Sequence, residues 1–303
     1  MRSYSSSPTT RPASTMNRNM RQLIRLAGHD PDLRTALRVS AKDLRQAAIA
    51  PIHALAHHLH AVLWRVQEPE VVIHTLHWWR EEIHAAGEGR ATHPLLVALQ
   101  PWIREIELPL DYFDELVDAR LSLVHQRALE TPQDHALHCY RAGSILLLLD
   151  GAICGYGART THRALTRLGH ALEELRILQQ LKLDLQHGLF LLPPDEVAAF
   201  GLDAAALRQP VLPPEATELF RSIGERVWSI LSEAVDEFDP DDRPGLLPVC
   251  VHAGLRRHLL ELLDEADYPV LQQHVETGPL HRWWLARLLA RQCKRNAPRA
   301  QTD

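Results

Sequence analysis

Leu76-His77-Trp78-Trp79-Arg80-Glu81-Glu82 is the stretch from which the fold can be inferred, together with the His93-Pro94 pair that follows it. Glu68-Pro69 precedes this stretch, and Gly87 and Gly89 follow it. Proline at a first helical position and glycine just after a last one are signals for the two ends of a helix. Its apolar residues recur at a period near 3.6, which is typical of a helix. The stretch therefore predicts two consecutive helices separated by a short turn.

The rest of the chain is divided in the same way by proline and glycine. Helical periodicity predicts helices over about residues 31–65, 111–129, 134–155, 161–187, 215–238, 246–266 and 280–295, with two short helical pieces after residue 195. No stretch alternates as a strand does. Of the 303 residues 46% are apolar and 23% are charged, and only 14 are glycine. This composition favours one all-α globular domain with a large core, over residues 30–297, and a tail over 298–303.

The first 29 residues differ in composition from the rest, since they contain five Arg and no Asp or Glu. Two interpretations stay open: a disordered or wrongly assigned basic leader of a bacterial protein, and an Arg- and Ser-rich transit peptide of an organelle. The first, which we prefer, predicts a cytoplasmic protein with peripheral contact to the inner membrane. The second predicts a mitochondrial one. The segment has no apolar core of the kind that a secretory signal needs.

Several classes of protein are disfavoured by the sequence. A net charge of -5 gives no field suited to nucleic acid. No run of about 20 uninterrupted apolar residues is present, so we expect no membrane span; Ile145–Cys154 is interrupted by Asp150 and is interpreted as a buried helix. The four cysteines lie far apart without CxxC spacing, which predicts free thiols in a reducing compartment.

Three sets of stretches, taken in order, resemble the squalene/phytoene synthase family. They are Leu76–Glu82 with His93-Pro94-Leu95; Leu168–Leu172 through Gly188 to Leu192-Pro193-Pro194-Asp195 and Phe200-Gly201-Leu202; and Leu247-Pro248, Leu255–Leu263, Asp267-Tyr268-Pro269 and Leu280–Leu289. Tyr140 also matches a tyrosine position of the family. The resemblance covers roughly residues 30–295. It implies a single-domain, isoprenoid-synthase-like helical bundle around a central cavity.

Within the family, Leu116-Val117-Asp118-Ala119-Arg120 is more similar to a divergent branch than to the head-to-head synthases. That branch includes proteins similar to an assembly factor of mitochondrial respiratory complex I. The resemblance therefore implies a role in assembly or interaction as an alternative to catalysis.

The resemblance implies that active members join two isoprenyl diphosphates, one of which first loses pyrophosphate to form an allylic cation. Mg²⁺ stabilises the leaving group, and this hard cation requires oxygen ligands. Asp pairs at i and i+4 lie on one face of each of two opposed helices. In this chain the first pair falls at His60 and Trp64, the second at Gln180 and Asp184, and a further acidic position at Leu123. Asp184 alone is a carboxylate.

Losing most of these ligands should remove the affinity for a Mg²⁺ cluster and the stabilisation that it gives to the transition state. We therefore expect a vestigial site at His60, Trp64, Leu123, Tyr140, Gln180 and Asp184. Mg²⁺ is expected as a cofactor only if catalysis survives, and Asp184 is the one position that matches a Mg²⁺ ligand.

Three histidines, His53, His57 and His60, fall at i, i+4 and i+7 and so share one face of a helix. In the resembled fold this helix faces the one that carries Asp184. Imidazoles at i and i+4 can hold Zn²⁺ or another borderline metal, so a replaced metal site is one interpretation. The simpler one is that a chain with 19 histidines places some of them here by composition alone.

Three functions follow from these observations. The first, which we favour, is a pseudoenzyme on the isoprenoid-synthase fold that acts in assembly or interaction with a protein partner. The second is an active prenyltransferase with altered metal ligands. The third is a protein that binds an isoprenoid or lipid without turnover in an apolar cavity. Fold alone does not decide among them.

Overall fold

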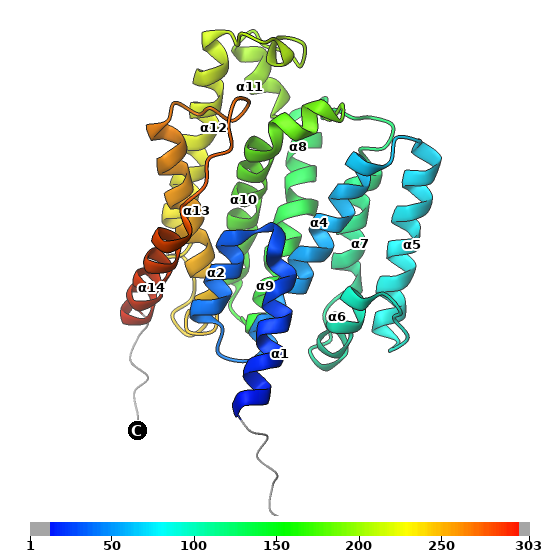
Figure 1. Ribbon diagram of the computed structural model, residues 1–303, viewed down its shortest axis with the longest axis vertical. Coiled ribbons are helices and arrows are strands. Elements are labelled where there is room, and N and C mark those ends of the chain that lie inside the picture. The colour runs from blue at the N-terminus through cyan, green and yellow to red at the C-terminus, as the bar shows by residue number, and fades with distance from the viewer. Residues whose placement is uncertain (1–12, 297–303) are drawn as a thin grey trace, which may run out of the picture.

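The computed structural model describes the backbone of residues 13–296, which fold into a bundle of helices (Figure 1). The elements are α1 (Ala13–Arg25), η1 (Leu26–His29), α2 (Pro31–Ser40), α3 (Leu44–Ala47), α4 (Ile49–Arg65), α5 (Pro69–Gly87), α6 (Pro94–Glu105), α7 (Leu110–Leu121), α8 (Pro132–Cys139), η2 (Tyr140–Ser144), α9 (Ile145–Cys154), α10 (Arg159–Gln186), α11 (Pro194–Ala199), η3 (Ala206–Arg208), α12 (Pro214–Glu233), α13 (Leu247–Glu265) and α14 (Pro279–Asn296). The described residues contain no strand, so the all-α prediction is confirmed.

Helix ends follow the sequence signals closely. The Asp30 carboxylate caps α2 by accepting hydrogen bonds from the backbone N–H groups of Asp32, at 3.0 Å, and Leu33, at 2.9 Å. Gly188, with φ of 78°, takes the left-handed conformation that follows α10. Proline occupies the first turn of α5 and α6 as predicted.

Two boundaries differ from the prediction. The helix expected over residues 111–129 ends at Leu121, because the backbone beyond it is engaged elsewhere. The Leu129 N–H donates to the Phe190 carbonyl and the Phe190 N–H donates to the Arg127 carbonyl, which holds the segment extended. The helix expected over residues 31–65 is divided into α2, α3 and α4.

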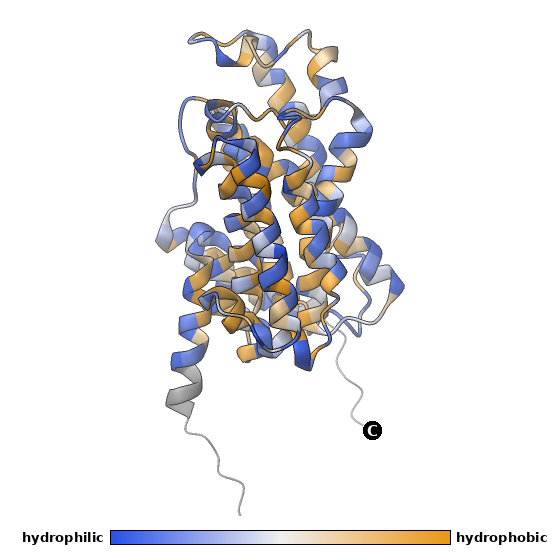
Figure 2. Cartoon of the chain, turned by 90° about the vertical axis from the view of Figure 1, so that its right-hand side faces the viewer, coloured by the Kyte–Doolittle hydropathy of each residue, from blue (hydrophilic) through white to orange (hydrophobic). Residues whose placement is uncertain are grey.

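The long helix α10 lies in the middle of the bundle, with α12 and α13 on one side and α4, α7 and α9 on the other (Figure 1). The apolar faces of the helices point inward and the polar faces outward (Figure 2). Their buried side chains form one main hydrophobic core. Because α10 contributes buried residues along its whole length, it brings side chains from several helices to one central region.

The N-terminal segment differs in part from the disordered leader expected over residues 1–29. Residues 1–12 lie outside the described residues, as does the expected tail over 298–303. The rest of the segment forms α1 and η1, and its Ile24 and Ala27 side chains are buried in the main core. The physical reason is that its few apolar residues recur at helical spacing and pack against α2, α3 and α4.

One helical stretch in the described part of the chain, Pro132–Cys154, is long and apolar enough to cross a membrane by length and composition. The sequence predicts no such stretch, because Asp150 interrupts its most apolar run. Within the fold, 67% of the most apolar 18-residue window of this stretch is buried. This burial is typical of a core helix, and the interpretation of Ile145–Cys154 as a buried helix is confirmed.

Candidate functional site

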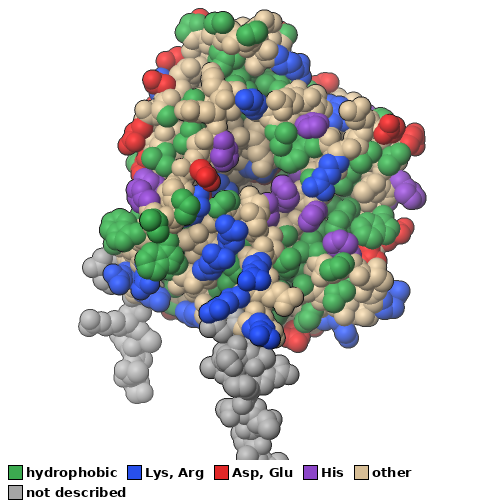
Figure 3. Space-filling model, viewed as in Figure 1, with side chains coloured by type: hydrophobic (Ala, Val, Ile, Leu, Met, Phe, Trp, Pro, Cys, Tyr) green, Lys and Arg blue, Asp and Glu red, His purple; other side chains and the backbone are tan. Residues whose placement is uncertain are grey.

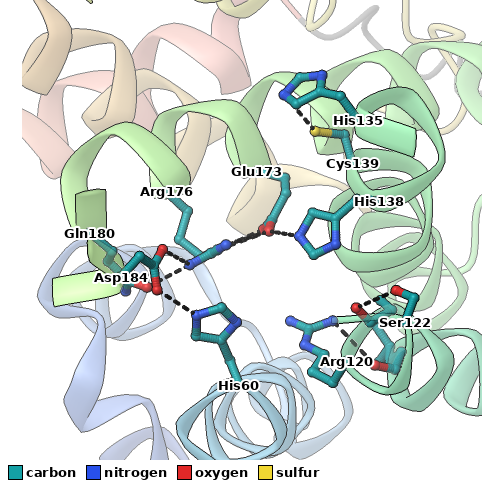
Figure 4. Close-up of polar contacts among 12 residues, drawn as sticks. His60, Arg120, Ser122, His135, His138, Cys139, Glu173, Arg176, Gln180 and Asp184 are labelled. Atoms are coloured by element: carbon teal, nitrogen blue, oxygen red, sulfur yellow. Dashed lines mark hydrogen bonds and ion pairs between the residues drawn. The ribbon is translucent and has the colours of Figure 1, made fainter. Parts of the chain in front are cut away.

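Asp184 on α10 faces His60 and Trp64 on α4. The Trp64 indole Nε1–H donates to the Asp184 Oδ1 at 2.8 Å, and His60 Nε2 lies 3.1 Å from the same oxygen. The Asp184 side chain is 1% exposed. His60 and Trp64, where the resemblance implies the first acidic pair, therefore both contact Asp184 directly. Figure 4 shows the contact of His60 with Asp184.

Arg176 occupies the space on the other side of Asp184. Its Nη1 lies 4.0 Å from the Asp184 Oδ2 and donates to the Gln180 Oε1 at 2.6 Å. The same guanidinium makes a bidentate contact with Glu173, with distances between 2.7 and 2.9 Å. Glu173 also contacts His138 Nε2 at 3.2 Å (Figure 4). A continuous polar network therefore links His60 on α4 through α10 to His138 on α8.

The charges in this network are compensated from within the protein. Burial alone would raise the pKa of the Asp184 carboxyl, but the hydrogen bond from His60 and the charge of Arg176 hold it below its usual range. Burial, reinforced by Arg176, lowers the pKa of His60 to about 4, so the imidazole is neutral near pH 7. A neutral His60 donates its Nε2–H to Asp184 and leaves Nδ1 without a partner.

These residues do not fit Mg²⁺. The cation prefers an octahedral shell of oxygen ligands that usually includes carboxylates. Trp64 presents an N–H donor, His60 a nitrogen, and the Gln180 amide oxygen already accepts from Arg176. One carboxylate remains, with a guanidinium beside it. No catalytic step through Mg²⁺ can be derived from this arrangement.

A cavity of about 110 Å³ lies beside the network. Its lining includes His60, Glu173, Arg176 and Gln180 and also the apolar Leu146, Leu147 and Leu172. A second, wider cavity of about 470 Å³ adjoins it and shares Arg176 and Gln180. Figure 3 shows the hollow on this face of the molecule, with histidine and basic side chains around it. The central cavity implied by the resemblance is present, but the space between His60 and Asp184 is closed by their direct contact.

The other two histidines of α4 take separate partners. His53 Nε2 lies 2.7 Å from the Asp150 Oδ2 on α9. Burial alone would lower the pKa of His53, but the charge of this carboxylate outweighs that effect and raises it. His57 stacks on His29, with ring centroids 4.5 Å apart. Together with His60 they do not form a set of donors within metal-binding distance of one another. The arrangement favours the simpler interpretation, in which these are packed and paired histidines.

Two of the expected positions lie away from Asp184. Leu123 is buried in the main core and does not line the cavity. Tyr140 is 40% exposed at the start of η2 and also does not line the cavity. The network brings together His60, Trp64, Gln180 and Asp184, and not the complete expected set.

The sequence does not single out Arg120 and favours a surface pair for Glu173 and Arg176, whereas Glu173 is buried in the structure. Arg120, which lines the cavity and is 2% exposed, falls inside a segment considered only for its family resemblance. Glu173 and Arg176 are three residues apart on α10, a spacing that is equally common in surface pairs. Only the tertiary contact with α8 distinguishes them, because it buries Glu173.

Comparisons with known proteins agree with this fold. Two curated proteins called phytoene synthase, from Mycobacterium bovis and Mycobacterium tuberculosis, are each 26% identical to the chain over 243 residues, which is 78% of this chain and 79% of theirs. A solved dehydrosqualene synthase in complex with a ligand superposes with a TM-score of 0.77 at 15% identity, covering 94% of this chain and all of that one. A squalene synthase from Alicyclobacillus acidocaldarius gives 0.67 at 18% identity, covering 85% of this chain and 97% of that one.

These structural neighbours establish the fold, since their sequences are too distant to establish more. The family model described as squalene/phytoene synthase matches residues 26–283, which is most of the chain. The chain therefore belongs to the squalene/phytoene synthase family.

Proposed function

We propose that this chain is a pseudoenzyme of its family, which does not ionise isoprenyl diphosphates and acts in assembly or interaction with another protein. The observation that carries the proposal is the state of Asp184. Its carboxylate accepts from Trp64, contacts His60 and lies beside Arg176, so it is stabilised by side chains of the protein itself. A metal ion would have to displace these partners before it could bind.

The physical requirement of the reaction supports the same conclusion. Departure of pyrophosphate into a water-poor cavity develops negative charge, which several carboxylate-bound cations must neutralise. Arg120, Arg176 and Arg256 are the arginines that line the cavity, but Arg176 is paired with Glu173 and Arg256 with Asp30. The remaining positive charge is too small to replace a metal cluster.

The size of the cavity also supports the proposal. Pockets for small molecules usually enclose about 300–1,000 Å³. The inner cavity beside Asp184 encloses about 110 Å³ and is lined by charged as well as apolar side chains. The inner cavity alone therefore cannot hold two prenyl chains, whereas the adjoining cavity of about 470 Å³ lies within this range.

A direct assay tests the proposal. Purified protein is incubated with farnesyl or geranylgeranyl diphosphate and Mg²⁺, and pyrophosphate release is measured beside an active member of the family. We expect release no faster than in buffer. Release that depends on enzyme and Mg²⁺ would show that catalysis survives and would overturn the proposal.

An active prenyltransferase with altered ligands is the second candidate, because both matched curated relatives are called phytoene synthase. The same assay decides between the two. Binding without turnover is separated from both by native mass spectrometry of freshly purified protein. A carrier should retain an isoprenoid or lipid, whereas an interaction protein should be recovered without one and with a reproducible protein partner.

A further inference from the structure

Three side chains with metal-binding donor atoms converge between α8 and α10, outside the network around Asp184. They are His135 and Cys139 on α8 and His170 on α10. One donor atom of each lies within 4.8 Å of the others, and the Cys139 Sγ is 3.7 Å from His135 Nε2 (Figure 4). This is the only group of three or more such donors at this distance in the described residues. His170 precedes Asp184 by 14 residues on α10, or roughly 21 Å along the helix.

The local sequence explains why these donors meet. His135 and Cys139 are four residues apart on α8, so their side chains lie on one face. The helix continues into η2, where Gly143 lies against Gly169 of α10 so closely that a Cβ on either residue would overlap the backbone of the other. His170 follows Gly169 directly. The backbone contact therefore brings the face of α8 within reach of His170.

The chemistry of the donors suits a borderline metal ion. Burial lowers the pKa of His135 to about 4, so its imidazole is neutral and has a free electron pair near pH 7. Burial, together with the nearby Glu173 and Glu174, raises the pKa of the Cys139 thiol. A divalent cation displaces the thiol proton, and the resulting thiolate then offsets one of its two positive charges.

We propose that His135, Cys139 and His170 bind one Zn²⁺ ion, which links α8 to α10. Two imidazole nitrogens and one thiolate are ligands that Zn²⁺ accepts in tetrahedral sites. Binding forms one Zn–S bond and two Zn–N bonds and releases the thiol proton to solvent. Glu174 is paired with Arg226 at 2.7 Å, so the fourth position is left to water, which enters beside the partly exposed His170. The proposal is independent of whether the chain catalyses prenyl transfer.

Cobalt titration tests the site with an optical signal. Full-length protein without an affinity tag is reduced, freed of metal with a chelator and titrated with Co²⁺. We expect a thiolate-to-cobalt charge-transfer band that saturates at one equivalent and is abolished by added Zn²⁺. Cys139→Ser should remove the band. Cys154→Ser, which removes a thiol outside the cluster, should keep it. A wild-type protein without the band, or a band that survives in Cys139→Ser, overturns the proposal.

A second pair of variants addresses the case in which Cys139→Ser does not fold. His170→Gln changes a partly exposed side chain, so the fold should persist and the Co²⁺ affinity should fall at least about tenfold. His74→Gln changes an exposed imidazole on α5 and should leave the affinity unchanged. Zn²⁺ should also raise the thermal unfolding temperature of the wild type and of His74→Gln more than that of His170→Gln. Equal affinity and equal thermal response in both variants would contradict the site.

Discussion

Asp184 is the one carboxylate at the positions where the family resemblance implies acidic residues, and its charge is satisfied by side chains of the protein itself. It remains on the inner face of α10. What differs is the facing helix, where His60 and Trp64 present nitrogen atoms to the carboxylate in place of two further carboxylates. A site that would require cations becomes a closed hydrogen-bond network, because donor groups now satisfy the charge that a metal would satisfy.

Restoring the carboxylates should reverse this balance. In the triple variant His60→Asp, Trp64→Asp and Gln180→Asp, four carboxylates face one another with Arg176 as the nearest cation. We expect the variant to be less stable than the wild type by about 3 kcal/mol or more in chelator, since buried like charges repel. Mg²⁺ should recover much of this loss and leave the wild type unchanged. Urea unfolding with and without Mg²⁺ measures both effects, and a Mg²⁺ response of equal size in the wild type would contradict the closed network.

The His53–Asp150 pair predicts a pH dependence of stability. The folded-state pKa of His53 is raised by Asp150 above the unfolded value of 6.5. The stabilisation from the ion pair is therefore fully present below pH 6.5 and is lost as the pH rises through the folded-state pKa. Asp150→Asn should cost about 3–5 kcal/mol at pH 6 and less at pH 9, measured by urea unfolding at both values.

A matched control separates this effect from loss of any carboxylate. Asp118 pairs near the surface with Arg80, so this pair contains no histidine. Asp118→Asn should cost at most about 1 kcal/mol at either pH. If the cost of Asp150→Asn were equally independent of pH, His53 would not be charged in the folded protein.

At the scale of elements, η2 and α10 are in direct backbone contact. Gly143 and Gly169 allow the two backbones to touch. Gly143→Ala should force the helices apart and cost about 1–3 kcal/mol in the free energy of unfolding. Gly157→Ala adds the same methyl group where no atom lies within 4 Å, and should change stability little. Comparable losses in the two variants would show that the cost is local to the backbone and does not come from packing.

Much of the helical architecture could be predicted from the sequence because proline and glycine act locally. Their positions indicate the ends of α5, α6 and α10 without knowledge of the neighbours. The early end of α7 could not be predicted in this way, since it depends on pairing with Phe190, about 60 residues further along the chain. The π-helical turn η2 depends in the same way on its contact with α10.

The difference between local signals and tertiary contacts also decides how much of the candidate site could be predicted. That His60, Trp64 and Gln180 stand where carboxylates would be expected could be inferred from the sequence only through the family resemblance. That Trp64 donates to Asp184 could not, because the direction of an indole N–H is fixed by tertiary packing. The spacing of His135 and Cys139 places them on one face of a helix, which two residues alone do not distinguish from ordinary packing. The third donor, His170, is brought beside them only by the fold.

At the scale of the whole molecule, buried ion pairs connect segments that are distant in sequence. Arg256 on α13 donates to Asp30 at 2.6 Å, and Arg282 on α14 donates to Asp32 at 2.7 Å. Both carboxylates lie at the start of α2. These ion pairs attach the N-terminal part of the fold to the last two helices. Removing the segment before residue 30 therefore tests whether it belongs to the domain, by its effect on the free energy of unfolding.

Deleting residues 2–29 should therefore destabilise the protein, although the composition of this segment suggests a leader. Ile24 and Ala27 are buried, and full burial of one isoleucine side chain contributes about 1.5–3 kcal/mol. We expect a loss of about 3 kcal/mol in urea unfolding, with the pairs at Asp30 and Asp32 retained. Deleting residues 2–12, which lie outside the described residues, is the control, and we expect it to leave the unfolding curve unchanged. If both deletions unfold like the full-length chain, α1 and η1 do not contribute to stability, and the domain begins near residue 30 as its composition indicates.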